Sequence, residues 1–512
     1  MPESTDHLNI AQLFLDARVA EGRGARIALR TDTETLTYQD LVTLSSKMAH
    51  LLAARGVRPE ERVIIALPDT PAFVGALFAI LRYGAVVVMV NPDLPADQIR
   101  YFFEYTRARA AFVDAAMLEA FAAATTGLPV PATLIPVGTP ETDMALATAA
   151  PDYPPFPSHR DDAAMWLFSG GTTGRPKAVV QTHRSYANTT RLYGQGVLAL
   201  TEDDITLAVP KLFFGYATGS NIFFPFSVGA SAAIFAERST PDALFARIGR
   251  HRPTVLINVP TMVQQMVAHA DAATADLSCL RLATSAGEAL PVELHERWTR
   301  AFGVDLLDGL GTAEMWHIFI SNRPGDVVPG TLGRVVPGFD VKLCDGEGAE
   351  VADGEVGVLW VKGDSRAIAY WQRMDDTMQA FRGEWYVSSD MLRRNPDGTF
   401  VYCGRADDML KVSGKWLSPG ELENCLLQHA DVREVAVVGV RNADGLVKPV
   451  AFVVSDSASH ALGVALQAFA KSRLEPYKYP REVRFLDALP RTHLGKVNRH
   501  ALAQSAGAAE AP

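Results

Sequence analysis

Residues Ser169 to Lys177 have the sequence SGGTTGRPK, a run of glycine and hydroxyl-bearing residues that ends in a lysine. Glycine permits tight turns in which backbone amides and hydroxyl groups can surround phosphate oxygens. The segment is not a Walker loop, because that motif needs glycine directly before the lysine and a hydroxyl directly after it, whereas Pro176 and Ala178 flank Lys177. It therefore predicts a phosphate-binding loop of another kind, with a plain strand-to-helix turn as the alternative. A second segment that we expect to contact phosphate, PRTHLGK, runs from Pro490 to Lys496.

Before the glycine-rich segment, helix and strand patterns alternate along the chain. Thr37 is placed to cap a helix that ends near Gly56, and the apolar run from Val63 to Leu67 predicts a buried strand. The stretch from Ala72 to Val90 is long enough to cross a membrane, but Arg82 to Gly84 interrupt it, so we interpret it as a helix, a stop and a buried strand. This alternation predicts an α/β fold with parallel sheets. Further strands are expected at Ala232–Phe235 and Val255–Asn258, and a helix at Thr261–Ala270.

The C-terminal part of the chain has a different pattern. From about Gly333 to Tyr402, short β-branched runs are separated by Gly, Asp and Pro turns, which predicts a β-rich subdomain. A separate α+β region follows, with a helical pattern from Pro419 to His429. Since 512 residues exceed what one core usually supports, we predict a large N-terminal domain (1–406), a smaller C-terminal domain (407–505) and a frayed tail (506–512). The strands expected in these regions are Phe339–Leu343, Val356–Val361, Phe400–Tyr402, Glu434–Val440 and Val450–Val454.

The charge balance argues against nucleic acid or an anionic membrane as a partner. The chain has 48 Lys and Arg against 58 Asp and Glu, a net charge of -10, without a long basic run. Anionic ligands must therefore be met by local cations. The four cysteines lack CxxC or metal-like spacing, and the N-terminal MPESTDHLNIAQ lacks the basic and apolar segments of a secretory signal. We expect reduced thiols, no zinc site and a cytoplasmic location.

Further motifs carry a resemblance to a known family. They are SAGEALP (Ser285–Pro291), DGLGTAE (Asp308–Glu314), GEVG (Gly354–Gly357), WYVSSD (Trp385–Asp390) and GRADDMLKVSGKWLSPGELE (Gly404–Glu423). Together with the two phosphate segments, they lie in the order typical of the adenylate-forming superfamily, which the chain resembles over nearly its whole length. This superfamily includes acyl-CoA synthetases, luciferases and the adenylation domains of peptide synthetases. Within it, DGLGTAEMWHIF and KLFFGY (Lys211–Tyr216) are most similar to benzoate and substituted-benzoate CoA ligases, including anthranilate-CoA ligase.

The resemblance implies a reaction in two steps. A carboxylate and ATP give an acyl adenylate and pyrophosphate, and the thiol of coenzyme A then displaces AMP to give a thioester. Because a carboxylate is a poor electrophile, AMP must become the leaving group, and this chemistry needs charge neutralisation more than a protein nucleophile. The resemblance also implies a mobile C-terminal domain that rotates about a hinge at Asp407 between the two steps.

Residue roles follow from the same resemblance. Lys496 would bridge the substrate carboxylate and the α-phosphate, and Glu314 would coordinate Mg²⁺. Asp390 and Arg405 would contact the ribose hydroxyls. The other implied contacts to ATP or AMP are Ser169, Gly170, Gly171, Thr172, Thr173, Gly174, Lys177, Gly287, Glu288, Ala289, Asp308, Gly309, Gly311 and Thr312. The implied contacts to coenzyme A are Ser413, Gly414, Lys415 and Trp416.

The chain departs from the family pattern at two of these motifs. The family usually has threonine directly before the metal-binding glutamate, but this chain has Ala313 there and Thr312 one position earlier. The hydroxyl contact to the α-phosphate would then come from Thr312 or be replaced by backbone amides. Ser388 and Ser389 replace the usual Thr-Gly before Asp390, so the local turn would differ.

The aryl-acid site is expected on two segments of the chain. Its implied residues are Phe214, Gly215, Tyr216, Gly219, Leu310 and His317, with ordinary core packing as the alternative. His317 would donate to a ring substituent or shape the base of the pocket. Small residues such as Gly287 and Gly311 would leave room for a flat slot.

The sequence does not decide which thiol accepts the aryl group or which substituents the aromatic ring of the acid carries. The first hypothesis is an enzyme that joins benzoate, an aminobenzoate or a hydroxybenzoate to coenzyme A. The alternative is a stand-alone enzyme that loads the phosphopantetheine arm of a carrier protein, and a third hypothesis is an aryl-acid sensor that has lost catalysis. The protein could be a monomer or a homodimer.

Overall fold

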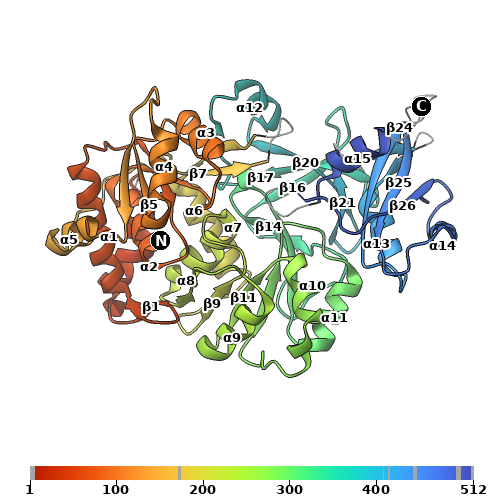
Figure 1. The fold of residues 1–512 in the computed structure, drawn as a ribbon, viewed down its shortest axis with the longest axis horizontal. Helices are drawn as coiled ribbons and strands as arrows, with labels where there is room; N and C mark the ends of the chain where they lie inside the picture. Colours follow the sequence, from red (N-terminus) through yellow and green to blue (C-terminus); the bar gives the residue numbers. More distant parts are fainter. Residues whose placement is uncertain are drawn as a thin grey trace. The chain divides into compact units, whose positions relative to one another are not determined.

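The computed structural model describes residues 6–170, 175–406, 409–412, 415–441, 447–491 and 497–508 (Figure 1). The chain divides into two compact units. The first unit comprises Met1–Leu290, Leu294–Val341 and Val361–Tyr386, and the second comprises Pro291–Glu293, Lys342–Trp360 and Val387–Pro512. The first unit contains two large sheets covered by helices, which confirms the predicted α/β class. The predicted boundary near Asp407 stays a prediction, because that residue lies outside the described ranges.

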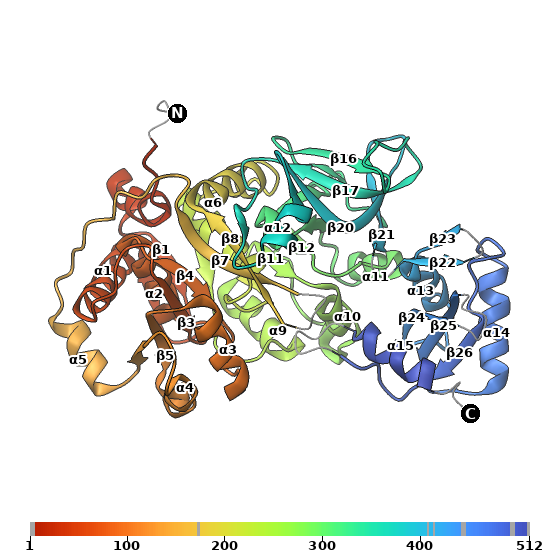
Figure 2. The same ribbon diagram turned by 90° about the horizontal axis from the view of Figure 1, so that it is seen from above.

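The first sheet has seven strands within the described residues, in the order β18-β8-β7-β4-β3-β5-β6. Their bounds are β3 (Arg62–Ala66), β4 (Val86–Met89), β5 (Ala110–Asp114), β6 (Thr133–Val137), β7 (Ala163–Ser169), β8 (Lys177–Thr182) and β18 (Ala369–Tyr370). Parallel strands β4 and β5 flank β3, so the winding direction reverses after β4. Because such crossovers are right-handed, α2 (Pro71–Tyr83) lies on one face, and α3 (Ala96–Thr106) and α4 (Leu118–Thr125) lie on the other (Figure 2).

Local signals in the sequence set the ends of these elements. Thr37 caps α1 (Tyr38–Ala54) in a capping box with Asp40, as its position predicted. Gly84, at φ +83°, ends α2 in a left-handed conformation that suits glycine. The long apolar stretch is therefore a helix, a stop and a strand, as predicted. Among the described residues, the structure contains no helix long and apolar enough to span a membrane.

The second sheet has nine strands in the part of the chain that the structure describes, in the order β15-β14-β13-β12-β11-β9-β10-β1-β2. Their bounds are β1 (Ile27–Arg30), β2 (Thr35–Thr37), β9 (Ile205–Ala208), β10 (Ser231–Ala233), β11 (Val255–Asn258), β12 (Leu282–Ser285), β13 (Leu306–Gly311), β14 (Ile318–Ser321) and β15 (Arg334–Val335). Helices α9 (Pro241–His251), α10 (Pro260–Ala268) and α11 (Val292–Phe302) pack on one face and bury Leu244, Val263 and Trp298 against it (Figure 1).

The order of this second sheet positions a ligand site. Strand β9 lies between β10 and β11, so the chain leaves β9 in one direction and returns past it. In open parallel sheets, ligands bind beyond the carboxyl ends of the strands at such a reversal. KLFFGY follows β9, GEALP follows β12, and DGLGTAE covers the end of β13 and the turn after it, so the topology brings the three motifs to one edge.

The second unit contains β-sheets and three helices among its described residues. Most of strands β16, β17, β20 and β21 lies in this unit, with β17 between β16 and β20 and with β21 paired to β20. Bounds in this part of the chain are β16 (Asp340–Cys344), β17 (Val356–Lys362), β19 (Phe381–Arg382), β20 (Trp385–Arg394), β21 (Phe400–Arg405), β22 (Leu410–Val412), β23 (Lys415–Leu417), β24 (Glu434–Arg441), β25 (Val447–Val454) and β26 (Glu482–Phe485). Helices α13 (Pro419–Leu427), α14 (His460–Lys471) and α15 (Arg499–Ala508) accompany β24–β26 (Figure 2).

The region from Gly333 to Tyr402 is β-rich, as predicted, since it carries the strands from β15 to β21. It also contains α12 (Met374–Ala380) and sends β18 back to the seven-stranded sheet. The frayed tail predicted from residue 506 is wrong at Ala506, which is fully buried on α15 against β24 and β25. Short stretches of small residues look like tails in sequence, whereas burial of alanine against a sheet is a tertiary effect. The remaining helices are α5 (Pro140–Thr148), α6 (His183–Thr189), α7 (Gly215–Thr218) and α8 (Phe224–Val228).

Candidate active site

Both ends of the glycine-rich segment are held in place. Strand β7 ends at Ser169 and β8 begins at Lys177, and these two residues are cross-strand partners in an antiparallel pair. Tyr101 on α3 donates its hydroxyl hydrogen to the carbonyl oxygen of Pro176 at 2.8 Å. Arg175 lies over the ring of Tyr101, 5.1 Å from its centre. The chain on either side of the loop therefore has a defined position before a ligand binds, as a preorganised site requires.

The side chain of Lys177 lies among residues far away in sequence. Its ammonium nitrogen is 3.5 Å from Asp376 Oδ2 on α12 and 4.6 Å from the ring centre of Tyr370 on β18. The Tyr370 hydroxyl donates to Glu314 Oε1 at 2.8 Å, and both side chains are buried. The structure thus brings together the predicted phosphate-loop lysine and the predicted metal-binding glutamate.

The turn that carries Glu314 follows β13 and is strained. Thr312 caps the short 3₁₀ turn Ala313–Met315 by accepting a hydrogen bond from the Met315 amide at 3.3 Å. Trp316 has φ +63° and ψ -44°, and the His317 amide donates to the Met315 carbonyl at 2.9 Å, which forms a γ-turn of the rare, strained type. Backbone strain of this kind persists where surrounding structure fixes it, and it is concentrated at functional sites. A role for Thr312 at the α-phosphate stays a prediction.

The predicted adenine segments lie at the carboxyl ends of β12 and β13. Ser285 and Asp308 are partners in register and are both buried. Asp308 Oδ1 has no hydrogen-bond partner among the described residues, and burial raises the pKa of this carboxyl well above its usual range. Gly287, at φ +91°, has open space where a side chain would be, and Glu288 accepts from Thr261 at 2.9 Å. Gly287, Glu288 and Ala289 are exposed, as residues that approach a ligand would be.

His317 lies at the centre of the predicted aryl site. Its Nε2 is 3.1 Å from the carbonyl oxygen of Tyr216 and 3.0 Å from Ser220 Oγ. A carbonyl oxygen only accepts, so Nε2 carries the hydrogen and Nδ1 is an acceptor. Nδ1 is buried and has no partner in the described part of the chain, and burial lowers the pKa of His317 to about 4. His317 is therefore a neutral histidine with one unused acceptor.

The aromatic part of the aryl site is ordered by hydrogen bonds. Tyr216 is partly buried, and its hydroxyl pairs with Thr284 Oγ1 at 2.6 Å. The rings of Tyr216 and His317 have centres 5.2 Å apart. Phe214 is more exposed, at 37%. Of the predicted residues of this site, Tyr216, Gly219 and His317 therefore meet in the first unit, between the segment after β9 and the turn after β13.

One detail of the predicted flat slot is wrong. A β-carbon at Gly311 would lie 2.5 Å from the carbonyl oxygen of His317, so the missing side chain makes room for backbone and not for a ligand ring. A β-carbon at Gly219 would lie 2.7 Å from His317 Cδ2, so this glycine accommodates the imidazole. The two glycines allow His317 to pack closely, which the sequence alone could not indicate.

Asp69 and Lys211 hold the loop after β9 through hydrogen bonds to backbone groups. Asp69, which follows β3, accepts a hydrogen bond from the Leu212 amide at 2.9 Å. Lys211 donates to the carbonyl oxygen of Phe235 at 2.8 Å. Burial raises the pKa of Asp69 to about 6 and lowers the pKa of Lys211 to about 8, and each charge partly offsets the shift of the other. The pair ties the aryl segment to the other large sheet.

In the second unit, the predicted ribose residues face each other across β20 and β21. Asp390 and Arg405 are register partners, with Arg405 Nη1 3.9 Å from Asp390 Oδ1. Ser388 donates to Asp390 Oδ2 at 2.5 Å, and Tyr402 donates to Oδ1 at 3.3 Å. Arg405 also donates to the Ser389 hydroxyl. The two serines that replace the family's Thr-Gly therefore orient Asp390 and Arg405, within a strand and not a turn.

Several predicted residues lie outside the described ranges and stay predictions. They are Gly171, Thr172, Thr173, Gly174, Asp407, Ser413, Gly414 and Lys496. The backbone of Lys415 and Trp416 belongs to β23, and their contacts with coenzyme A are likewise predictions.

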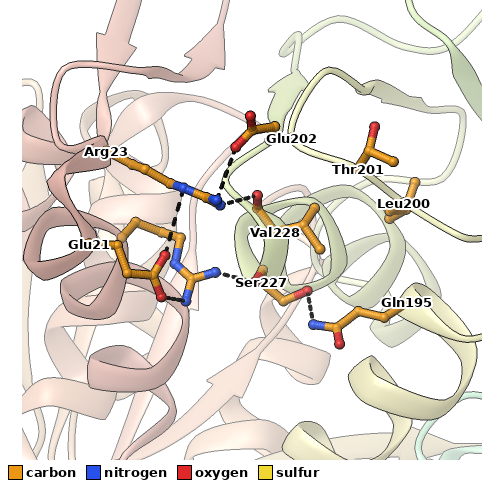
Figure 3. Close-up of a pocket in the computed structure, with 9 residues that line it drawn as sticks. Glu21, Arg23, Gln195, Leu200, Thr201, Glu202, Ser227 and Val228 are labelled. Carbon is orange, nitrogen blue, oxygen red and sulfur yellow. Dashed lines mark hydrogen bonds and ion pairs between the residues drawn. The ribbon is translucent and has the colours of Figure 1, made fainter.

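Two other groups in the first unit were not expected from sequence. A basin of about 570 Å³ is lined by Arg18, Arg23, Glu21 and Glu202 among others, and its charged side chains pair with one another (Figure 3). Asp242, His269 and Asp271 offer ligand atoms within 4.8 Å of one another. Both ring nitrogens of His269 already face partners, because Nδ1 accepts from the Asp271 amide at 3.2 Å and Nε2 is 3.2 Å from Asp242. None of the predicted site residues belongs to either group.

Five residues that complete the site through contacts across the fold were not predicted from sequence: Tyr370, Asp376, Ser220, Thr284 and Asp69. None lies in a glycine-rich or charged motif. Only Asp69 carried a signal, as an acidic residue directly after a strand in a parallel sheet.

Comparisons with known proteins agree with this architecture. Residues 16–371 match the AMP-binding enzyme family, and residues 421–496 match the AMP-binding enzyme C-terminal domain. A benzoate-CoA ligase of Thauera aromatica is 39% identical over 505 residues, which cover 97% of this chain and 96% of the relative.

Two solved structures are similar over nearly the whole chain. The anthranilate CoA ligase AuaEII in complex with anthranoyl-AMP has a TM-score of 0.94 at 34% identity and covers 99% of each chain. A benzoate CoA ligase from Burkholderia xenovorans has a TM-score of 0.89 at 40% identity and covers 97% of this chain and 99% of the other. Because residues 16–371, well over half of the chain, match it, the chain belongs to the AMP-binding enzyme family, within the adenylate-forming superfamily.

Proposed function

We propose that this protein is an AMP-forming acid-thiol ligase that activates an aromatic carboxylic acid with ATP and transfers the aryl group to coenzyme A. The observation that carries the proposal is the joint placement of Lys177 and Glu314 on Tyr370, in the same unit as the aryl segment around His317. A cation for phosphate oxygens and a hard carboxylate ligand are the two groups that ATP chemistry requires. The similarity to benzoate-CoA and anthranilate-CoA ligases supports an aryl acid as the substrate.

In the first step, a carboxylate oxygen of the acid attacks the α-phosphorus of ATP. The bond from that phosphorus to the bridging oxygen breaks, and pyrophosphate leaves with the electron pair. Lys177 would neutralise charge on the phosphate oxygens, and Lys496 would do so at the attacking carboxylate. Asp390 and Arg405 would hold the ribose. In the second step the thiol of coenzyme A loses its proton and attacks the acyl carbon, and the bond to AMP breaks.

Glu314 fits a Mg²⁺ site by its donor chemistry. A carboxylate is a hard oxygen ligand, and the Tyr370 hydroxyl contacts Oε1, so Oε2 is the oxygen available to a metal. When bound, Mg²⁺ neutralises part of the charge on ATP phosphates.

His317 favours particular substituents on the aromatic ring of the acid. Its neutral imidazole presents an acceptor at Nδ1, which suits a ring that carries an amino or hydroxyl group. An unsubstituted ring would leave that nitrogen without a partner. We therefore propose benzoates as the class, with aminobenzoates and hydroxybenzoates as its members to test first.

The test is carboxylate-dependent pyrophosphate release with Mg²⁺ and ATP over benzoates, aminobenzoates, hydroxybenzoates, cinnamates and fatty acids, with and without coenzyme A. The expected result is turnover on one or a few benzoates, with an aryl thioester formed only when coenzyme A is present. Pyrophosphate release without thioester would point to a carrier-protein acceptor. No release with any acid would leave a binding protein and overturn the proposal.

A further inference from the structure

Tyr370 contacts two charged residues of the candidate site through different parts of one side chain. It ends β18, where Tyr370 pairs with Val179 of β8 in antiparallel register. Its amide donates to Thr377 Oγ1 at 3.1 Å, and Thr377 belongs to α12. The side chain is 7% exposed. The ring therefore has one position, set by a sheet on one side and a helix on the other.

The hydroxyl of Tyr370 acts on Glu314. A carboxylate accepts but cannot donate, so Tyr370 is the donor in the 2.8 Å hydrogen bond to Oε1. Glu314 is 5% exposed, so few water molecules can reach it to orient the carboxylate instead. Tyr386 interacts with the same hydroxyl and is also buried. The hydrogen bond selects one orientation of a side chain that otherwise rotates about its terminal bond.

The ring face of Tyr370 acts on Lys177. The ammonium nitrogen is 4.6 Å from the ring centre, within the range of a cation-π contact. Asp376 on α12 contacts the same ammonium from 3.5 Å. Among the described residues no ion pair joins Lys177 directly to Glu314, and Tyr370 lies between the two charges. If they paired with each other, they would cancel the charges that bind phosphate and metal.

We propose that Tyr370 is a positioning residue for adenylate formation, whose hydroxyl orients Glu314 toward a divalent metal and whose ring holds Lys177 toward the phosphates of ATP. This inference rests on the proposed function of the same site. It adds a residue that contacts neither ATP nor the metal but positions Lys177, which faces the phosphates, and Glu314, which faces the metal. Groups hydrogen-bonded to a metal ligand typically change metal affinity or activity by about 10- to 100-fold when they are removed.

Two substitutions separate the two contacts. Tyr370→Phe removes the hydroxyl and keeps the ring, whereas Tyr370→Leu removes both. Tyr38→Phe is the matched control, because Tyr38 is fully buried and its hydroxyl makes one hydrogen bond, to the Ala230 carbonyl at 2.6 Å. Melting temperatures check that each variant is folded.

The first readout is the Mg²⁺ concentration that gives half-maximal pyrophosphate release at saturating ATP and acid. We expect Tyr370→Phe to raise it about tenfold. The KM for the acid should stay unchanged, because Glu314 does not bind it. A purely structural loss would lower the amount of active protein without moving the Mg²⁺ dependence.

The second readout is calorimetric binding of ATP, which needs no turnover. Without metal, Tyr370→Phe should bind ATP as the wild type does, and Tyr370→Leu should bind it about two- to fivefold more weakly because Lys177 loses the ring. With Mg²⁺, both variants should bind more weakly than the wild type. Should the leucine variant not fold, the phenylalanine variant alone decides the role of the hydroxyl.

The outcomes distinguish the inference from the proposed function. A wild-type Mg²⁺ dependence in Tyr370→Phe, or an equal shift in Tyr38→Phe, overturns the role of the hydroxyl. Equal ATP binding by a folded Tyr370→Leu overturns the role of the ring. If the wild type binds Mg²⁺ and ATP and the variants shift as expected, but no acid promotes pyrophosphate release, the proposed function fails and the inference stands. A wild type that binds no ATP overturns both.

Discussion

A methyl group added at Gly311 would collide with the turn that carries Glu314 and His317. The β-carbon of Gly311→Ala would lie 2.5 Å from the His317 carbonyl oxygen, 2.6 Å from its carbonyl carbon and 2.8 Å from the Ile318 amide nitrogen. Ordinary contacts begin at 3.4 Å, so relief needs a backbone displacement of about 0.9 Å, the difference between 3.4 and 2.5 Å. The atoms involved are backbone atoms, which cannot rotate away as a flexible side chain can.

Two consequences follow from a displacement of this size. Overpacking typically costs about 1 to 3 kcal/mol of folding free energy. A misplacement of about 1 Å at a reacting centre can cost about 100-fold in rate. We therefore expect Gly311→Ala to lower the melting temperature and to slow aryl adenylate formation about 100-fold, because both His317 and Glu314 move with the turn.

The assay is pyrophosphate release under saturating substrates, with melting temperature measured in parallel. Gly249→Ala is the matched control, because Gly249 is exposed on α9 and nothing lies within 4 Å of an added β-carbon. Alanine is favoured over glycine inside a helix by about 1 kcal/mol, so the control should melt higher and keep wild-type turnover. Wild-type turnover and melting of Gly311→Ala would refute the close packing of this turn.

Three further changes test other parts of the site. Ala313→Thr should speed adenylate formation about tenfold, because it adds a hydroxyl where the family has one and a hydrogen bond to a charged group is typically worth about 1.5 to 3 kcal/mol. Lys496→Ala should slow adenylate formation about 100- to 1000-fold and spare thioester formation from preformed adenylate, measured as separate half-reactions. Burial lowers the pKa of His183 to about 3, so the unfolded chain binds a proton below pH 6.5 that the folded chain does not, and stability falls as the pH falls. The free energy of unfolding of His183→Gln relative to wild type should therefore rise by about 1.4 kcal/mol for each unit that the pH falls below 6.5. Urea denaturation at several pH values measures this difference.

A specific result would contradict each of these three predictions. An unchanged or slower rate in Ala313→Thr would mean that the capped Thr312 or backbone amides already meet the α-phosphate. Equal losses in both half-reactions of Lys496→Ala would remove the argument for two domain orientations. A pH-independent difference between His183→Gln and wild type would mean that His183 is protonated in the folded state.

Local physical chemistry accounts for the elements that the sequence predicted well. A threonine with a carboxylate three residues later caps α1, and a glycine in the left-handed region ends α2, because both effects act within one turn of the chain. The strand Val255–Asn258 was predicted with the bounds that β11 has, since a short apolar run between turns is typical of a buried strand. Family motifs likewise singled out Lys177, Glu314, Asp390 and His317 from sequence order, and the roles of these residues stay predictions.

Tertiary structure decided which of those residues meet and how. Tyr370 joins Lys177 and Glu314 because β18 returns to pair with β8, an approach of segments far apart in sequence that no local pattern encodes. The burial of Ala506 and the close approach of the His317 backbone to Gly311 also depend on packing that no local pattern encodes. The tautomer of His317 depends on the Tyr216 carbonyl, which α7 brings to it. Sequence determines propensity and chemistry residue by residue, whereas burial and partner choice depend on long-range packing, which only the folded chain supplies.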